Sequence, residues 1–187
     1  MSIPIISFFS LLFLTFFIPK THGAFAKSIS KQDMGIKEEQ NLTHLHFYFH
    51  DYVQGSNQTA LRIAQAPTTD KSPGAFGALV MIDDPLTEGP ESDSKIIGYA
   101  QGMYGFADQK TAGLLMVMNY VFVEGEYKGS TLSVLGRNEV MNKVRELAIV
   151  GGSGVFRFAS GYAQAKTITM LDSSGASVVE YDVYVQH

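Results

Sequence analysis

The sequence predicts an all-β protein built as an eight-stranded antiparallel up-and-down β-barrel, with a two-sheet sandwich as the structural alternative. Short apolar or alternating runs recur along the 187-residue chain, and they are rich in Val, Ile, Phe and Tyr, which strands favour. Clusters of Gly, Pro, Asp and Asn separate these runs, as turns require. The sequence contains no long amphipathic helical pattern.

The expected strands and turns follow one another along the chain. The strands cover roughly residues 44–53, 76–83, 96–107, 112–123, 128–136, 146–151, 153–168 and 177–186. The clearest turn signals are Asp84-Pro85, Glu88-Gly89-Pro90, Glu124-Gly125-Glu126, Gly151-Gly152 and Ser173-Ser174-Gly175. Because the chain has no cysteine, its stability must come from a packed core, a closed sheet or oligomerisation. A closed eight-stranded barrel leaves no free edge and has room for one small ligand.

The N-terminal segment predicts export. Residues 3–19 are almost unbroken Ile, Leu and Phe, and Gly23 is a small residue at a suitable cleavage point, so residues 1–23 are interpreted as a secretory signal peptide. An N-terminal signal anchor is the alternative. Residues 24–41 are mixed polar and charged and are expected to form a flexible leader before a domain at 42–187. We expect a secreted protein without a membrane segment once the signal is removed.

Two features of the surface support that view. Asn41-Leu42-Thr43 and Asn57-Gln58-Thr59 are N-glycosylation sequons, so Asn41 and Asn57 are candidate glycosylation sites. The formal net charge is -4, and neither sign forms a long run. This charge pattern argues against a nucleic-acid surface.

The run from His44 to Asp51 carries the main chemical signal. It alternates strictly, so that Leu45, Phe47, Phe49 and Asp51 fall on one side of a strand. If that side lines a closed interior, burial raises the pKa of the terminal carboxyl, which can then donate or accept a proton. The alternative is an Asp that only accepts backbone hydrogen bonds in the next turn.

The outer wall of the expected barrel is apolar in places. Residues 114–123 are apolar on both faces, with Asn119 as the exception, whereas residues 177–186 alternate between apolar and polar faces. An apolar outer wall predicts that another subunit covers it. We therefore expect a homo-oligomer held together by strand faces.

A metal site is a weaker alternative. His44, His46 and His50 share the side opposite the apolar row, and alternate residues of one strand can share a metal. No carboxylate joins them at a suitable sequence spacing, so a solvated or interface face is favoured and no metal is expected. The run at 151–154 lacks the Lys that follows a phosphate loop and is interpreted as a tight turn.

Three further residues have two interpretations each. Asp84 is either a catalytic acid, as proposed for Asp51, or a residue that starts a turn before Pro85, and the turn is favoured. Arg145 is either part of a surface ion pair or a cation at the barrel mouth that meets a phenolate or carbonyl oxygen. Tyr104 either fills the core or faces a ligand, because the glycines at 102 and 105 would let a ligand approach the backbone.

Five segments occur in order across the chain: Phe47–Asp51, Met81–Thr87, Gly98–Tyr104, Gly129–Asn138 and Val150–Phe158. Together they resemble the plant dirigent proteins. The resemblance implies an eight-stranded barrel of the dirigent and allene-oxide-cyclase type, a homotrimer, secretion to the apoplast and a small phenolic substrate. Fold analogy alone does not establish the isomerase activity of the allene oxide cyclases.

The resemblance also assigns site residues. Asp51 matches the family's strand-one acid, Tyr104 a pocket tyrosine, and Arg145 the arginine after the Gly-Arg-Asn segment. Lignan-forming members commonly have Gly-Ala-Asp-Pro where this chain has Gly-Arg-Asn-Glu at 136–139, so Asn138 replaces their second pocket aspartate. This departure points to the branch that includes the pterocarpan synthases, which dehydrate an isoflavanol with ring closure, and that also contains members of unknown substrate.

The resulting hypothesis needs neither a cofactor nor a metal. Asp51 protonates a departing hydroxyl, Arg145 and Tyr104 stabilise the oxygen of the quinone methide that forms, and a second phenol closes a ring. Direct substrate contacts are expected from Phe49, Asn138 and Met118.

Two rival functions use the same barrel. In the first, the protein does no chemistry and only steers the coupling of phenoxy radicals made by a separate oxidase, a laccase or peroxidase. In the second, it is an apoplastic defence or wall protein that binds phenolic or glycan ligands without turnover. The segment 24–41 carries no lectin-like or wall-anchoring signature, which ranks the second rival last.

Overall fold

The computed structural model describes residues 26–36, 39–173 and 175–187, so the expected signal peptide and Ser174 lie outside the described residues. Residues 1–36 and 37–187 form two separate units. The described part of the first unit contains one short turn, in which the Met34 N–H donates to the Ser30 carbonyl over 3.2 Å. In the part of the chain that the structure describes, no helix is long and apolar enough to cross a bilayer.

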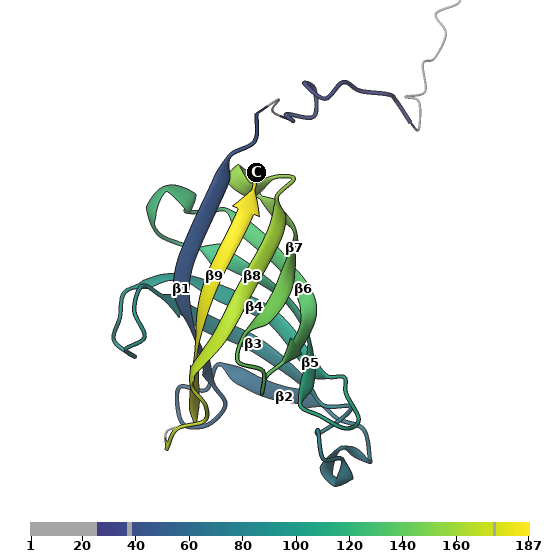
Figure 1. The fold of residues 1–187 in the computed structure, drawn as a ribbon, viewed down its shortest axis with the longest axis vertical. Helices are drawn as coiled ribbons and strands as arrows, with labels where there is room; N and C mark the ends of the chain where they lie inside the picture. The colour runs from purple at the N-terminus through teal and green to yellow at the C-terminus, as the bar shows by residue number, and fades with distance from the viewer. Residues whose placement is uncertain (1–25, 37–38, 174) are drawn as a thin grey trace, which may run out of the picture. The chain divides into compact units, whose positions relative to one another are not determined.

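The described part of the second unit is a succession of strands with three short 3₁₀ helices (Figure 1). The strands are β1 (Leu42–Tyr52), β2 (Ala60–Ala64), β3 (Leu79–Thr87), β4 (Ile96–Phe106), β5 (Gly113–Phe122), β6 (Thr131–Glu139), β7 (Arg145–Ser153), β8 (Ser160–Thr169) and β9 (Ala176–Gln186). The 3₁₀ helices are η1 (Thr69–Lys71), η2 (Gly125–Tyr127) and η3 (Gly154–Phe156).

The strands close into a barrel. From β2 to β9 each strand pairs antiparallel with the next, and β1 pairs along its whole length with β9. The pairs Tyr48–Thr87 and Phe49–Leu86 join β1 to β3 and complete the ring, so β1 and β3–β9 form an eight-stranded barrel with β2 attached to β3. The predicted all-β barrel is therefore confirmed.

Strand alternation sets which side chains enter the lumen. On β1, Phe47 and Phe49 are buried while His44 and His46 are exposed, as the strict alternation of that run predicts. On β5, every second residue from Leu114 to Phe122 is buried, whereas Leu115 and Val117 on the outer wall are exposed.

Packing of large aromatic side chains closes one half of the lumen, which we call the closed half. Phe47 is fully buried and packs edge-on against Tyr120, with ring centroids 5.0 Å apart. Beyond them, Phe156 of η3 contacts Tyr127 at 5.0 Å and Phe122 at 5.7 Å between centroids. The opposite half, which contains Asp51 and Tyr104, is called the open half.

Two predicted turns lie inside strands instead. Asp84-Pro85 is in the middle of β3, next to a bulge in the β3–β4 register and to the point where β1–β3 pairing stops. An interrupted ladder tolerates the missing N–H of proline. Gly151-Gly152 belongs to β7, where both residues pair with β6. A glycine is needed at 152 because a Cβ there would lie 2.6 Å from the Phe156 carbonyl oxygen of η3.

Strand β2 was not predicted from the sequence. It is five residues long and exposed at four of them, so it carries little of the apolar alternation that marks a strand. The structure places it at the mouth of the open half, paired with β3.

Candidate active site

The open half contains a cavity with two compartments. The outer compartment has a volume of about 470 Å³ and is lined mainly by apolar side chains, with polar groups from Asp51, Gln58, Arg62 and Tyr104. The inner compartment measures about 80 Å³. Asp51 and Tyr104 line both compartments, so they mark the boundary between them. The outer volume falls in the range of sites for small organic ligands, which the inner volume does not reach.

Asp51 ends the inward-facing row of β1. Its Oδ2 atom accepts a hydrogen bond of 3.3 Å from the Tyr104 hydroxyl, and its Oδ1 atom is buried without a hydrogen-bond partner among the described residues. Burial raises the pKa of Asp51 to about 6, although the Tyr104 hydrogen bond acts in the other direction. Burial and both nearby carboxylates raise the pKa of the Tyr104 phenol, so it stays a hydrogen-bond donor.

Asp84 is a second acid of this site, contrary to the prediction that it only starts a turn. It is fully buried, it follows the inward row of β3 through Ile82 and Leu86, and it accepts a hydrogen bond from the Thr59 hydroxyl. Continuing the Tyr48–Thr87 and Phe49–Leu86 register places Asp84 opposite Asp51.

The environment of Asp84 keeps it protonated near neutral pH. Burial and the charge of Asp51 raise the pKa of Asp84 to about 8, while the hydrogen bond from Thr59 partly offsets them. Its Oδ2 atom has no hydrogen-bond partner among the described residues. Two buried carboxyls with raised pKa values, each with an unpaired oxygen, are an arrangement typical of acid–base sites.

Arg145 is buried inside the barrel, so it is neither part of a surface ion pair nor at the mouth. It begins β7 and lines the inner compartment, where its Nε donates to the Asn138 Oδ1 atom over 3.0 Å. Its Nη1 atom has no hydrogen-bond partner, and no carboxylate of the described residues lies within ion-pair distance. Burial lowers the pKa of this guanidinium. A buried cation without a carboxylate partner can stabilise negative charge on a bound oxygen.

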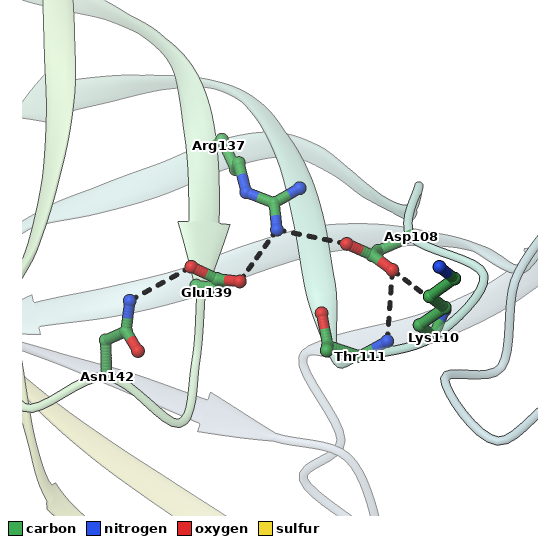
Figure 2. Close-up of polar contacts among 6 residues, drawn as sticks. All are labelled: Asp108, Lys110, Thr111, Arg137, Glu139 and Asn142. Atoms are coloured by element: carbon green, nitrogen blue, oxygen red, sulfur yellow. Dashed lines mark hydrogen bonds and ion pairs between the residues drawn. The ribbon is translucent and has the colours of Figure 1, made fainter.

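A polar network on the outside of the wall holds the strand that carries Asn138 (Figure 2). The Arg137 Nη2 atom donates to Asp108 over 3.0 Å and to Glu139 over 2.8 Å. Asp108 also accepts the backbone N–H groups of Lys110 and Thr111, which together with Arg137 lower its pKa. The network ties the β4–β5 loop to β6, while the neighbouring Asn138 side chain is buried inside.

The remaining expected substrate contacts divide between cavity and core. Phe49 and Asn138 line the inner compartment. Met118 is buried in the core and lines neither compartment. Gly102 near Tyr104 serves strand packing, because a Cβ there would lie 2.2 Å from the Val117 carbonyl oxygen.

Each of the three histidines of β1 has a different hydrogen-bond partner. His44 pairs with Asp182 at 2.8 Å and His46 with Glu180 at 3.0 Å, both across the strand pair from β9. His50 is buried, unlike the exposed face expected for it, and shares a 2.7 Å hydrogen bond with the Thr87 hydroxyl. Within residues 26–36, 39–173 and 175–187, no three His, Asp or Glu side chains are arranged to hold a metal ion.

The two sequons lie on the surface. Asn41 and Asn57 are both exposed. Thr59, the third residue of the second sequon, is also the residue that hydrogen-bonds Asp84, and Gln58 between them lines the outer compartment. A substitution that removes this sequon should therefore be made at Asn57.

Comparisons with known proteins agree with the barrel fold. The family model described as "Dirigent-like protein" matches residues 42–186. "Pterocarpan synthase 1" from Glycine max is 47% identical over 97% of this chain and 97% of its own length. "Dirigent protein 21" from Arabidopsis thaliana is 49% identical over 88% of this chain and 86% of its own length. A solved structure of a pterocarpan synthase dirigent protein superposes with a TM-score of 0.75 at 51% identity, covering 81% of this chain and 87% of that one.

Proposed function

The chain belongs to the dirigent family, and we propose that it is a cofactor-independent dehydratase that converts an isoflavanol into a pterocarpan through a quinone methide. The observation that carries this proposal is the carboxyl of Asp51 at the edge of a cavity for one multi-ring guest, with the buried carboxyl of Asp84 opposite it in the strand register and both pKa values raised. An acid that holds its proton near the working pH is what removal of a hydroxyl group requires.

The first step is the loss of water. Protonated Asp51 donates its proton to the hydroxyl on the benzylic carbon of the substrate, and the carbon–oxygen bond breaks with its electron pair leaving in water. The conjugated phenol gives up its proton to solvent as the quinone methide forms. Asp84 stays neutral up to about pH 8, so the Asp51 carboxylate that remains after proton transfer does not face a second full negative charge.

The second step is ring closure. A second phenol of the same molecule attacks the electrophilic carbon from one face and passes its proton to Asp51, which restores the acid. The oxygen of the methide recovers a proton as the aromatic ring re-forms, so the net change is the loss of one water. The Tyr104 hydroxyl and the buried Arg145 guanidinium favour negative charge on oxygen at this site. Apolar walls exclude water that would quench the methide.

The decisive experiment is incubation of the purified protein with a racemic isoflavanol in the absence of any oxidase or oxidant. We expect loss of water and a ring-closed product enriched in one enantiomer on chiral chromatography. A parallel incubation contains a monolignol with and without a one-electron oxidant. If the protein alters product handedness only in the presence of oxidant, the dehydratase proposal fails and the steering function replaces it.

The steering function remains the second candidate because a specific observation favours it. The outer compartment is largely apolar and could hold phenoxy radicals made by a separate oxidase as readily as an isoflavanol. Its weakness is that radical coupling makes no use of an acid with a raised pKa.

We further propose that the functional form is a secreted homotrimer. The outer wall of neighbouring strands exposes Leu79 and Met81 on β3, Met103 on β4, Leu115 and Val117 on β5 and Leu135 on β6. Such a patch is covered by another subunit in stable assemblies. Multi-angle light scattering should give one species with three times the monomer mass, and a monomer at micromolar concentration would reject the trimer.

Export rests on the expected signal peptide and on the exposed Asn41 and Asn57. A C-terminally tagged full chain expressed in plant cells should reach the apoplastic fluid, and glycosidase treatment should lower its apparent mass. Retention of an unglycosylated chain inside the cell would contradict this assignment.

A further inference from the structure

The outer end of the cavity carries a cation that the reaction above does not use. Arg62 lies on β2 and lines the outer compartment, together with Gln58 from the segment that leads into that strand. Both residues line the outer compartment alone, whereas Arg145 lines the inner compartment. Because this cation would meet the substrate of the same site, its role rests on the proposed function.

The sheet register places Arg62 on the lumen face, in one row with Tyr104. Arg62 pairs with Val80 on β3, and Val80 pairs with Tyr104 on β4. Residues directly opposite one another across strands share a face of the sheet. Because neighbouring strands are about 4.8 Å apart, the backbones of Arg62 and Tyr104 are separated by about 10 Å. That span matches the length of a fused two- or three-ring aromatic system.

The volumes of the two compartments indicate that the rings of a guest occupy the outer one. At about 80 Å³ the inner compartment has room for a water molecule or a small substituent, not for a ring system. A multi-ring guest whose reacting carbon lies beside Asp51 must therefore occupy the outer compartment of about 470 Å³. The part of the guest that extends away from Asp51 then shares this compartment with Arg62 and Gln58.

These two side chains offer a matched donor and acceptor. The Gln58 amide nitrogen donates to the Val53 and Ala60 carbonyl oxygens, both over 2.8 Å, which fixes the amide orientation. No described residue donates to the Gln58 Oε1 atom, so it is a free acceptor. Arg62 uses Nη1 on Gln65 at 3.1 Å and lies 3.7 Å from Asp70, which leaves further N–H donors.

We infer that Arg62 and Gln58 form a specificity site for a free phenolic hydroxyl that takes no part in the reaction. This hydroxyl lies at the end of the substrate that is remote from the reacting carbon. A phenol donates to Gln58 and accepts from Arg62, whereas its methyl ether cannot donate and a ring carbon–hydrogen does neither. The site therefore selects isoflavanols whose distal hydroxyl is neither methylated nor glycosylated.

The test is equilibrium binding of ring-closed probes, which needs no turnover. Three pterocarpans are compared, with a hydroxyl, a methoxy group or a hydrogen at the distal position. Because the chain has no tryptophan, isothermal titration calorimetry is the readout. The wild-type protein should bind the phenol about tenfold more tightly than either analogue, the effect expected for a hydrogen bond to a charged group.

Variants assign that preference to its source. In Arg62→Ala the preference for the phenol over the hydrogen analogue should fall several-fold, whereas the preference over the methyl ether, which rests on donation to Gln58, should largely persist. Arg62→Lys should keep part of the preference over the hydrogen analogue. Asp70→Asn removes the ion-pair partner but keeps the guanidinium, so the preference should persist. Arg157→Ala, an exposed arginine next to η3, is the matched control and should behave as wild type.

The outcomes separate this inference from the proposed function. Selective binding without dehydration of an isoflavanol would reject the dehydratase and leave the specificity site standing. Dehydration without any preference among the probes would overturn the specificity site alone. Survival of the full preference over the hydrogen analogue in Arg62→Ala, or no measurable binding of any probe to the wild-type protein, would also overturn it.

Discussion

The closed and open halves of the lumen are built from the same alternating strands but are filled differently. In the closed half, Phe47 packs against Tyr120, and Phe156 of η3 packs against Phe122, and these rings leave almost no exposed surface. In the open half, the inward positions of the same β1 strand end in Asp51, and the facing strands carry Tyr104 and small or branched residues around a cavity. The fold therefore gains its stability at one end and keeps room for chemistry at the other.

The largest effect should come from the acid of the open half. Asp51→Asn keeps the size of the side chain but removes the transferable proton, so turnover of the isoflavanol should fall by about 100- to 10,000-fold. Circular dichroism and light scattering should show an unchanged fold and assembly. Asp83→Asn, on the outer face of β3, is the control and should retain activity. Near-normal turnover in Asp51→Asn would remove this residue from the mechanism.

The closed half should respond in stability instead of catalysis. Phe47→Ala deletes a fully buried ring and should lower the free energy of unfolding by about 3–5 kcal/mol, measured in urea. Phe158→Ala makes the same deletion at a half-exposed position outside the core and should cost much less. Equal losses in the two variants would mean that the packed aromatic cluster is not what stabilises the barrel.

Asp84 should lower the free energy of unfolding of the protein as the pH rises. Its pKa is about 8 in the folded protein, against an ordinary value of 3.8, so the folded state binds the proton more tightly. The stability that this carboxyl contributes is complete below about pH 3.8 and is lost as the pH rises through about 8, at about 1.4 kcal/mol per pH unit for one proton.

Asp84→Asn should therefore be more stable than the wild-type protein at pH 8 and similar to it at pH 4, because asparagine can still accept the Thr59 hydrogen bond. Thermal unfolding across this pH range measures the difference, with Asp83→Asn as the control. A difference that does not grow with pH would show that the folded pKa of Asp84 is close to its ordinary value.

The smallest effect should come from the outer wall. Arg137→Ala removes the centre of the network in Figure 2, yet the Arg137 side chain is 57% exposed, and exposed ion pairs contribute little to stability. Turnover should stay within about twofold of wild type, and the midpoint of unfolding should shift only slightly and less at high salt. A large loss of activity would mean that the outer network positions Asn138 and Arg145.

The accuracy of the sequence prediction depended on whether the information was local. Period-two alternation is local, so it predicted the inward row of β1 and the position of Asp51 at its end. It does not reveal depth along the barrel axis, which is why Met118 was expected at the cavity and lies in the core. Asp84 was misassigned because its burial depends on the contact between β1 and β3, which closes the barrel. The burial of His50 likewise depends on its contact with Thr87 of β3.

The role of Arg62 could not be predicted from local sequence either. Strand β2 is short and mostly exposed, so its pattern does not predict a strand, and its position at the mouth is set only by pairing with β3. The family resemblance supplied roles for Asp51, Tyr104 and Arg145, but the second carboxyl and the outer cation came from the three-dimensional arrangement.

The central claim is that the open half holds carboxyls whose pKa values are raised by burial. The most direct measurement is a ¹³C NMR titration of the protein labelled at its aspartate carboxyl carbons, with Asp51→Asn and Asp84→Asn used for assignment. The predicted result is one carboxyl titrating near pH 6 that disappears in Asp51→Asn and another near pH 8 that disappears in Asp84→Asn. If both carboxyls titrate near pH 3.8, burial does not raise the pKa values of Asp51 and Asp84, and the proposed chemistry has no proton donor.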